Sequence, residues 1–436
     1  MQQRILTGIT TTGTPHLGNY VGAIRPAIAA SLAPDAQSFF FLADYHGLIK
    51  CDDPERIERS RIEVAAAWLA SGLDPERVLF YRQSDIPETL ELNWLLTCVT
   101  SKGLMNRAHA YKAAIDGNKT AGDDVDADIT MGLYCYPILM AADILLFRAH
   151  KVPVGRDQLQ HLEMARDIAQ RFNQLFGKGA LMLTLPEAMV GDQALLPGFD
   201  GRKMSKSYNN TIPLFAGGVA GLKAGVSRIV TDSQKPGEPK NPEANTILTL
   251  YSAFASTDEI STFRAELVDG LGWGDAKSRL VQCVERELMP MRERYDALMR
   301  APGRIDDILK EGAEKARALA RPLIAELRDA VGLRSFVGTP TLTRKMAEPA
   351  LLPKPPKMRQ YRDETGAYYF KLVARDARIL ILGGPFASGG DAGRYIQALR
   401  DAKGDITELT KICAGEGLTI QDVEDGLSEW VASVGE

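Results

Sequence analysis

The stretch that most constrains the fold is residues 4–19, at the start of the chain. Residues 4–9 predict a first strand, and residues 17–32 predict the helix that follows it. Between them, Gly8 and Gly13 flank a turn of small hydroxyl residues. Free backbone N–H groups and the helix dipole at such a turn favour a phosphate. The plainer alternative is an ordinary strand–turn–helix unit whose glycines only shape the turn.

Three side chains at the start of this predicted helix suit a nucleotide. His16 can donate to a phosphate, Gly18 lets a flat ring approach closely, and Asn19 can bond a phosphate or ribose oxygen. The turn is therefore a candidate nucleotide site.

A second candidate stretch is the basic loop at 201–207, Gly-Arg-Lys-Met-Ser-Lys-Ser. Its lysines, Lys203 and Lys206, suit the stabilisation of a leaving pyrophosphate, where charge develops in the transition state. A solvated basic surface loop is the alternative for a charge run taken alone.

The segment 134–147 is apolar apart from Asp143. A buried carboxylate there is costly unless it is hydrogen-bonded or paired. Tyr136, Met140 and Asp143 are spaced i, i+4, i+7, so they share one face of a predicted helix. An indole, with one N–H donor on a flat apolar ring, fits that face. A core helix with Asp143 bonded to a backbone N–H or an arginine remains the alternative.

Strands and helices alternate through the first half of the chain and predict an α/β, Rossmann-like, doubly wound parallel sheet. His46 follows a buried strand at 38–44, where such sheets place ligands, although a plain turn residue is the alternative. Gln158, near a helix start, is a candidate for the charged groups of an amino acid. Gly155, Arg156 and Asp157 are candidates for ribose or adenine contacts.

The polar segment 106–128 interrupts this pattern and is interpreted as an insertion or mobile loop. Its best phosphate candidate is Lys112, although a surface lysine is the plainer interpretation. From about 216 the pattern becomes all helical, with helices at about 273–300 and 304–331. Pro290 and Pro322 are expected to start, kink or break segments there.

The predicted domains are a catalytic domain at 1–215 with an insertion around 105–130, a helical domain at 216–335, a proline-rich linker at 336–360 and a small α+β module at 361–436. The module contains a hairpin and a helix at about 391–402.

Composition excludes several classes of protein. With 45% hydrophobic and 25% charged residues the chain is ordinary globular material, and no apolar run is long enough to span a membrane. We therefore expect a cytoplasmic protein. The net charge of −4 argues mildly against a constitutive nucleic-acid binder. Five cysteines without a Cys-x-x-Cys pair argue against a structural metal site.

Together, His-Leu-Gly-Asn at 16–19 and Lys-Met-Ser-Lys-Ser at 203–207 resemble the two signatures of class I aminoacyl-tRNA synthetases. Within that class the chain is similar to the bacterial tryptophanyl-tRNA synthetases over about residues 1–333. Further segments that carry the resemblance are 71–76, 140–146, 152–158, 160–163, 230–233 and 311–316.

The resemblance implies ATP-dependent activation of L-tryptophan to tryptophanyl-adenylate, transfer to tRNA(Trp), Mg²⁺ bound through ATP, and a homodimer. It implies that the helical domain binds the tRNA anticodon. It implies catalytic roles for His16, Lys112, Lys203 and Lys206. The tryptophan-binding residues it implies are Asp143, Tyr136, Met140, Gln158 and His46. The ATP-binding residues it implies are Thr10, Thr11, Thr12, Gly18, Asn19, Gly155, Arg156, Asp157, Leu195, Lys203, Met204, Ser205, Lys206 and Ser207.

The chain departs from the family pattern at several points. Thr10, Thr11 and Thr12 stand where the family usually has Gln-Pro-Ser, and Arg156 stands where an acidic residue is usual. The segment 102–112 differs from its commoner form, and the module at 361–436 is an addition to the usual enzyme. Two other functions are the alternatives: a nucleotidyltransferase that does not act on tRNA, and a non-catalytic paralogue used for binding. The helical region argues against the first and the intact loop at 203–207 against the second.

Overall fold

The computed structural model describes residues 3–49, 51–155, 158–190, 195–243, 245–334, 356–374, 376, 378–401, 412–414 and 418–434. The chain forms two compact units, Met1–Arg334 and Ser335–Glu436.

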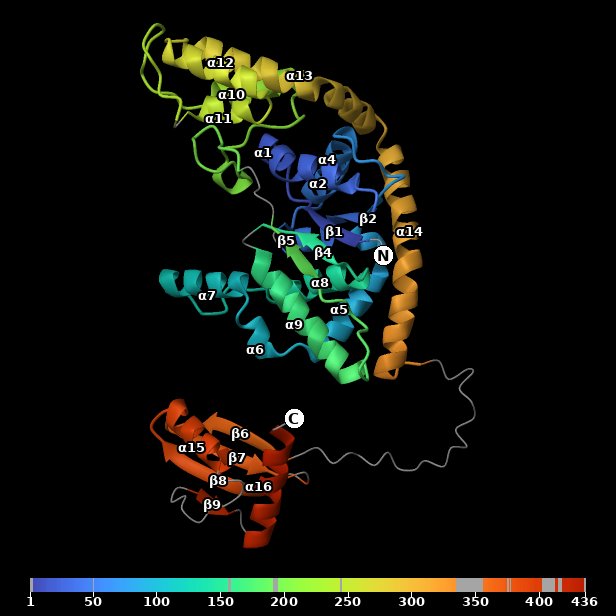
Figure 1. Ribbon diagram of the computed structural model, residues 1–436, viewed down its shortest axis with the longest axis vertical. Helices are drawn as coiled ribbons and strands as arrows, with labels where there is room; N and C mark the ends of the chain where they lie inside the picture. Colours follow the sequence, from blue (N-terminus) through green and yellow to red (C-terminus); the bar gives the residue numbers. More distant parts are fainter. Residues whose placement is uncertain are drawn as a thin grey trace. The chain divides into compact units, whose positions relative to one another are not determined.

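The first unit is built on a parallel sheet of five strands in the order β3-β2-β1-β4-β5 (Figure 1). The strands are β1 (Gln3–Thr10), β2 (Ala36–Ala43), β3 (Leu79–Arg82), β4 (Lys151–Pro153) and β5 (Glu187–Met189). The strand order reverses beside β1, so the carboxyl ends of β1 and β4 flank the crevice where such sheets bind ligands. The predicted doubly wound parallel sheet is confirmed.

Helices cover both faces of this sheet (Figure 1). Along β2, Phe40 and Leu42 point into one hydrophobic cluster, while Phe39 and Phe41 point into the other. This alternation explains why β2 is apolar at every position from Phe39 to Ala43. The helices of this part are α1 (Leu17–Asn19), α2 (Arg25–Ser31), α3 (Asp44–Gly47), α4 (Pro54–Ala70), α5 (Pro87–Val99), α6 (Lys102–Met105), α7 (His109–Ala121), α8 (Met131–Leu146) and α9 (Leu159–Phe176), with a π-helical turn at Tyr20–Ile24 and a 3₁₀ turn at Gln83–Asp85.

The polar segment 106–128 is not the loop that its composition predicts, because it contains the helix α7. No side chain of α7 is buried, so the helix buries little apolar surface, and it projects from the rest of the unit (Figure 1). Gly122, in the left-handed conformation at φ 80°, ends it.

The remaining helices of the first unit continue the all-helical pattern expected from residue 216. They are α10 (Gly218–Ser227), α11 (Thr246–Ser252), α12 (Thr257–Val268), α13 (Trp273–Arg300) and α14 (Pro302–Val331), preceded by a 3₁₀ turn at Lys206–Tyr208. Pro290 and Pro322 do not break segments, since they lie inside the continuous helices α13 and α14. Helix α14 runs along β3, so the helical part and the sheet belong to one compact unit (Figure 1).

The second unit is an antiparallel sheet in the order β6-β7-β8-β9 with two helices. Its elements are β6 (Lys357–Arg362), β7 (Tyr368–Val373), β8 (Ile379–Phe386), α15 (Gly389–Asp401), β9 (Ile412–Ala414) and α16 (Ile420–Val434). The predicted hairpin is the β7–β8 pair. The linker predicted up to residue 360 ends earlier, because residues 357–360 already belong to β6, and its residues 336–355 lie outside the described part.

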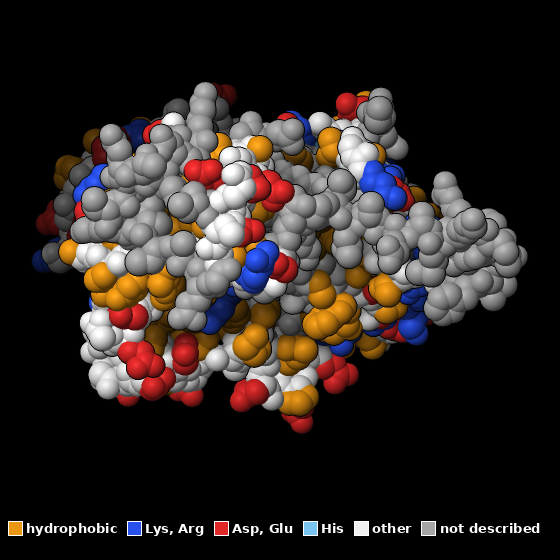
Figure 2. Space-filling view, turned by 90° about the horizontal axis from the view of Figure 1, so that it is seen from below, with side chains coloured by type: hydrophobic (Ala, Val, Ile, Leu, Met, Phe, Trp, Pro, Cys, Tyr) orange, Lys and Arg blue, Asp and Glu red, His pale blue; other side chains and the backbone are white. Residues whose placement is uncertain are grey.

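Among the described helices, none is long and apolar enough to cross a membrane. Hydrophobic side chains are nevertheless visible at the surface in groups between charged ones (Figure 2).

Candidate active site

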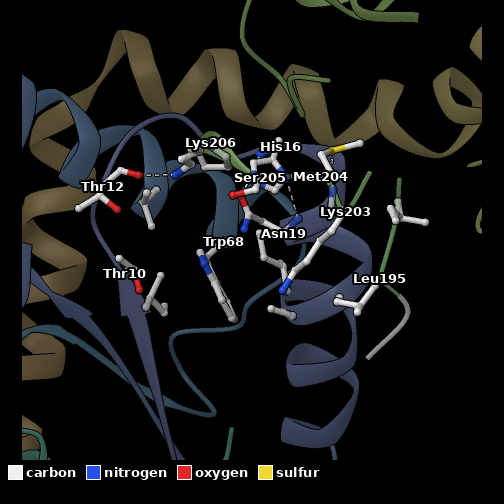
Figure 3. A pocket seen from close by; sticks show the side chains of 18 of the residues that line it. Thr10, Thr12, His16, Asn19, Trp68, Leu195, Lys203, Met204, Ser205 and Lys206 are labelled. Carbon is white, nitrogen blue, oxygen red and sulfur yellow. Dashed lines mark hydrogen bonds between the residues drawn. The ribbon is translucent and has the colours of Figure 1, made fainter. Parts of the chain in front are cut away.

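A cavity of about 430 Å³ opens where β1 ends. Its wall comes from the turn after β1, from the helical turns that follow, from Trp68 on α4 and from the loop 195–206 (Figure 3). The predicted residues that line it are Thr10, Thr12, His16, Gly18, Asn19, Leu195, Lys203, Met204, Ser205 and Lys206. The two signature stretches, about 190 residues apart in the sequence, therefore meet at one cavity.

The turn after β1 is fixed by local hydrogen bonds. Gly13 takes the left-handed conformation at φ 73°, and its N–H donates to Ser60 Oγ at 2.9 Å. His16 caps α1, because its Nδ1 accepts from the Asn19 N–H at 3.3 Å while Asn19 Oδ1 accepts from the His16 N–H at 3.2 Å. A π-helical turn follows at Tyr20–Ile24 and places Gly22 and Ala23 on the cavity wall.

The His16 ring is neutral. Burial, and secondarily the nearby Lys206 ammonium, lower the pKa of His16 to about 4. Since Nδ1 accepts the Asn19 N–H, the ring proton sits on Nε2. His16 therefore offers a neutral N–H donor.

The basic loop is closed over the turn. Met204 is buried, and its sulfur accepts from the Gly18 N–H at 3.4 Å. Lys206 Nζ donates to the carbonyl oxygens of Thr12 and, at 2.8 Å, of Gly13. Although Lys206 keeps an exposed surface, burial of its ammonium lowers the pKa to about 8. The Lys203 side chain reaches into the cavity beside Leu195 (Figure 3).

The loop is held from beneath by Asn210, which sequence reasoning missed. This fully buried amide accepts from the Ser205 N–H at 2.7 Å and donates to Asp200 Oδ1 at 2.7 Å and to the Lys203 carbonyl at 3.0 Å. No pattern in the sequence distinguishes Asn210 from the neighbouring Asn209, because its partners, two backbone groups and the Asp200 carboxylate, come together only in the folded loop.

Asp143 lies at the centre of a second polar cluster. Its carboxylate is buried and accepts from Gln83 Nε2 at 2.8 and 2.9 Å, and it bonds His46 Nε2 at 2.9 Å. Burial raises the pKa of Asp143, and the hydrogen bonds of His46 and Gln83 oppose that rise. The partners of Asp143 are therefore the side chains of Gln83 and His46, and not the backbone N–H or the arginine of the alternative interpretation.

Gln83 is the second residue that the sequence analysis missed. It follows β3 directly, as His46 follows β2, and both lie at the carboxyl edge of the sheet. The rule that selected His46 would have selected Gln83 as well.

Tyr136 and Gln158 meet through His161, which the sequence analysis also did not select. Tyr136 Oη lies 2.8 Å from His161 Nε2, and Gln158 Oε1 lies 2.9 Å from His161 Nδ1. The His46 ring contacts the Tyr136 ring edge-on, with centroids 6.2 Å apart. Met140, on the same helix as Tyr136 and Asp143, is half-buried against the hydrophobic cluster of which Ile144 is part. The predicted tryptophan-binding residues Asp143, His46, Tyr136 and Gln158 therefore form one connected group.

This group and the cavity lie on the same edge of the sheet. Thr10, at the end of β1, pairs with Ala43, at the end of β2. The next residues also meet, since Thr11 Oγ lies 3.0 Å from where a Cβ on Gly47 would stand. A small molecule bound at Asp143 and a nucleotide bound in the cavity would thus be neighbours.

Some predicted site residues lie away from the cavity. Thr11 is buried, and its hydroxyl bonds the Ala43 carbonyl at 3.4 Å. Gly155 and Ser207 do not line the cavity, and Lys112 is exposed on α7. Arg156 and Asp157 lie outside the described residues.

The basic residues of the helical part, such as Arg286, Arg292, Arg294, Lys315 and Arg317, are candidates for RNA phosphates from the sequence alone, with a solvated face as the alternative. In the structure they bond other groups of the protein. Arg292 is buried against Glu285, and Arg317 donates to Glu88 at 3.1 Å. Arg286 pairs with Glu259, Lys315 with Glu311, and Arg294 donates to the Ala70 carbonyl. Arg286 and Lys315 remain exposed and belong to a solvated face, whereas Arg292 is buried.

Comparison with known proteins gives a consistent result. Residues 1–289 match the family described as tRNA synthetases class I (W and Y). A tryptophan–tRNA ligase of Bordetella parapertussis is 60% identical over 403 residues, covering 92% of this chain and 88% of that protein. The tryptophan–tRNA ligase of Pseudomonas aeruginosa is 60% identical over 400 residues, covering 92% and 89%.

Solved structures agree with these sequence matches. The tryptophanyl-tRNA synthetase of Campylobacter jejuni, complexed with ADP and tryptophan, superposes with a TM-score of 0.69 at 38% identity, covering 76% of this chain and all of that one. With its sequence, its fold and its cavity in agreement, the chain belongs to the tryptophan–tRNA ligase family of class I aminoacyl-tRNA synthetases.

Proposed function

We propose that the chain activates L-tryptophan with ATP and transfers it to tRNA(Trp). The observation that carries the proposal is that the Asp143 cluster and the cavity closed by Lys206 share one edge of the sheet. In the first step the tryptophan carboxylate attacks the α-phosphate, forming tryptophanyl-adenylate and releasing pyrophosphate. In the second step a terminal hydroxyl of the tRNA takes the acyl group and releases AMP. The protein contributes positioning and charge stabilisation to this chemistry.

In the tryptophan site, Asp143 would accept the indole N–H, held in place by Gln83 and His46. Tyr136 and Gln158, linked through His161, would bind the amino-acid head group, and Met140 would line the ring pocket. Because Gln83 and His46 already hold the Asp143 carboxylate in place, it can accept one further hydrogen bond without moving. This favours a ligand whose N–H donor, like that of indole, lies at one defined position.

In the nucleotide site, Gly18 and Asn19 would contact the nucleoside part of ATP. Thr10 and Thr12 would contact its phosphates. His16 would donate Nε2–H to a phosphate oxygen. Lys203 and Lys206 would stabilise the charge that develops on the leaving pyrophosphate. Lys206 would exchange the carbonyls of Thr12 and Gly13 for phosphate oxygens.

Mg²⁺ would bind in this site through the nucleotide. Among the described residues that line the cavity there is no Asp or Glu, and no described cluster of His, Cys, Asp and Glu could hold a metal. Phosphate oxygens of the nucleotide would therefore supply its ligands, and the ion would neutralise charge on the triphosphate.

For the macromolecular partners, we propose that the helical part at 216–334 contacts tRNA. Lys223, Arg300 and Arg304 are exposed there and are the first basic candidates. We further propose a cytoplasmic homodimer. Leu90 and Trp94 share one face of α5 and are 41% and 66% exposed, and an exposed apolar face of this kind marks a protein interface.

The decisive assay is amino-acid-dependent ATP–pyrophosphate exchange with tryptophan, tyrosine and phenylalanine. We expect exchange with tryptophan alone. Exchange with tyrosine would overturn the Asp143 pocket, and no exchange with any amino acid would indicate the binding paralogue. Lys206→Ala should reduce exchange severely, whereas Lys119→Ala, at an exposed position of α7, should leave it unchanged.

The tryptophan pocket has its own test. In Asp143→Asn an amide would face the Gln83 amide and lose an acceptor, so the KM for tryptophan should rise at least about tenfold. Asp167→Asn, on the exposed face of α9, is the matched control. An unchanged KM in Asp143→Asn would remove the role assigned to this carboxylate.

A further inference from the structure

The sheet of the second unit has one face covered by helices. Phe370 and Leu372 on β7 pack with Ala392 and Leu399 of α15 and with Leu427 of α16 in one hydrophobic cluster. Side chains alternate along a strand, so the neighbours of Phe370 and Leu372 point to the opposite face. Those neighbours are Tyr369, Lys371 and Val373.

The strand register defines the opposite face, which we call the outer face. Tyr361 on β6 pairs with Tyr369, and Arg359 pairs with Lys371. Lys371 in turn pairs with Leu382 on β8. A β-bulge between Leu372 and Val373 turns both Leu380 and Ile381 toward the core, which leaves Ile379 and Leu382 exposed on the outer face.

The outer face carries a stacked pair of aromatic rings. The rings of Tyr361 and Tyr369 lie 5.6 Å apart with an interplanar angle of 18°. Lys371 Nζ lies 5.3 Å from the centre of the Tyr361 ring. A Cβ on Gly384 would stand 2.7 Å from the Tyr369 ring, so the absence of a side chain at Gly384 is what lets that ring lie over β8. Tyr361 stays 38% exposed.

The charge of the second unit is divided between its elements. The described strands β6, β7 and β8 contain the basic residues Lys357, Arg359, Arg362 and Lys371 and no Asp or Glu. The acidic residues lie on the helices and in the turns. Asp363, in the β6–β7 turn beside Tyr369, is engaged by the Thr365 and Ala367 N–H groups. The outer face is thus a basic surface with two accessible rings.

We propose that the outer face binds unpaired nucleotides of an RNA single strand. Stacking of bases on aromatic side chains of an open sheet, with basic residues beside them for the phosphates, is how sheets of this architecture bind single-stranded nucleic acid. Two rings on neighbouring strands suit two or three successive bases. The acidic net charge of the whole chain does not oppose this, because Arg359 and Lys371 supply a local positive patch.

The test uses the full-length chain and a fluorescein-labelled octauridylate, measured by fluorescence anisotropy over a series of salt concentrations. The double variant Tyr361→Leu/Tyr369→Leu should weaken binding by tenfold or more, since each ring stacks one base. Tyr361→Phe/Tyr369→Phe, which keeps both rings, should restore it. Lys371→Gln should reduce the salt dependence of binding, whereas Arg394→Gln, a charge-matched change on α15, should not.

Three results would overturn the proposal. These are the absence of octauridylate binding, binding that both leucine substitutions leave unchanged, and binding that depends on Lys371 but not on the rings, which would indicate a general polyanion surface. Thermal unfolding of each variant confirms that the sheet remains folded. Tryptophan-dependent exchange measured on the same variants should be unchanged, so loss of RNA binding can be told apart from failure of the proposed catalytic function.

Discussion

The ammonium nitrogen of Lys206 lies 2.8 Å from the carbonyl oxygen of Gly13. This contact links the basic loop to the turn after β1. Burial of the Lys206 ammonium lowers its pKa to about 8. Its charge is therefore sensitive to pH in the range where the reaction is measured.

The first prediction concerns this charge. Lys206 is protonated below pH 8 and loses its proton above it, so the KM for ATP should rise as pH increases through about 8. In Lys206→Arg the guanidinium stays charged, and this rise should disappear even if the rate falls. Steady-state kinetics from pH 6.5 to 9.5 test this. A parallel rise in both proteins would assign the pH dependence to another group.

The second prediction concerns the neutral His16. Its pKa of about 4 in the folded chain lies below the ordinary value of 6.5, so the unfolded chain binds this proton first as the pH falls. Stability from this group is present above pH 6.5 and is lost between 6.5 and 4, by about 3 kcal/mol in the free energy of unfolding. His16→Asn keeps a capping side chain and should lose less stability over this range.

Denaturant unfolding at pH 7 and pH 5 measures that difference. The exposed His109 provides the control variant His109→Asn, which should follow the original protein. Equal acid sensitivity in His16→Asn and the original protein would contradict a depressed His16 pKa.

The third prediction concerns Asn210. Asn210→Ala removes the acceptor of the Ser205 N–H and the donor to Asp200 inside a closed loop, and should cost about 2–3 kcal/mol of stability. Hydrogen exchange at residues 198–206 should accelerate. The exposed neighbour Asn209 has φ 48°, so Asn209→Gly is a tolerated control. Unchanged exchange in Asn210→Ala would mean that other contacts hold the loop.

The fourth prediction concerns the packing of α14 on the sheet. A Cβ at Gly312 would stand 1.8 Å from the Phe80 carbonyl oxygen, so Gly312→Ala must separate the helix from β3 and should destabilise the first unit by about 1–3 kcal/mol. At Gly303, in the first turn of the same helix, a Cβ meets nothing within 4 Å. Gly303→Ala should be neutral or slightly stabilising. Calorimetric unfolding compares the two, and equal midpoints would refute the close contact.

Much of the fold was predictable because its strands and helices have strong local patterns. The apolar run of β2 and the Asp53 cap before α4 each mark an element without reference to the rest of the chain. Helix α7 was not predictable in this way, because none of its side chains is buried and its composition matches that of a loop. Pro290 and Pro322 suggested breaks, but the packed helices α13 and α14 accommodate them.

The site could be predicted where a residue's chemistry is visible in its neighbours along the chain. Asp143 was found because a lone carboxylate in an apolar helix requires partners, and Lys206 because its loop has a recognisable composition. Gln83 was missed because its partner Asp143 lies 60 residues away in the sequence. His161 and Asn210 were missed although Gln158 and Ser205 lie only three and five residues away, because the sequence does not show that these side chains bond each other. A side chain whose role is to hold another residue in place has no sequence pattern by which it could be predicted.

The long helix α14 also sets a distance. Its 30 residues extend for about 45 Å at the rise of an α-helix. Near its start, Asp306 pairs with Arg82 of β3, and near its end Arg328 pairs with Glu91 of α5. Between these two ion pairs, Gly312 allows the helix backbone to contact β3. A substitution on its exposed face leaves this spacing intact, whereas one inserted residue would turn the helix by about 100° and move every later contact out of register. The helix thus fixes the distance between these contacts, and the number of its residues is constrained more tightly than their identity.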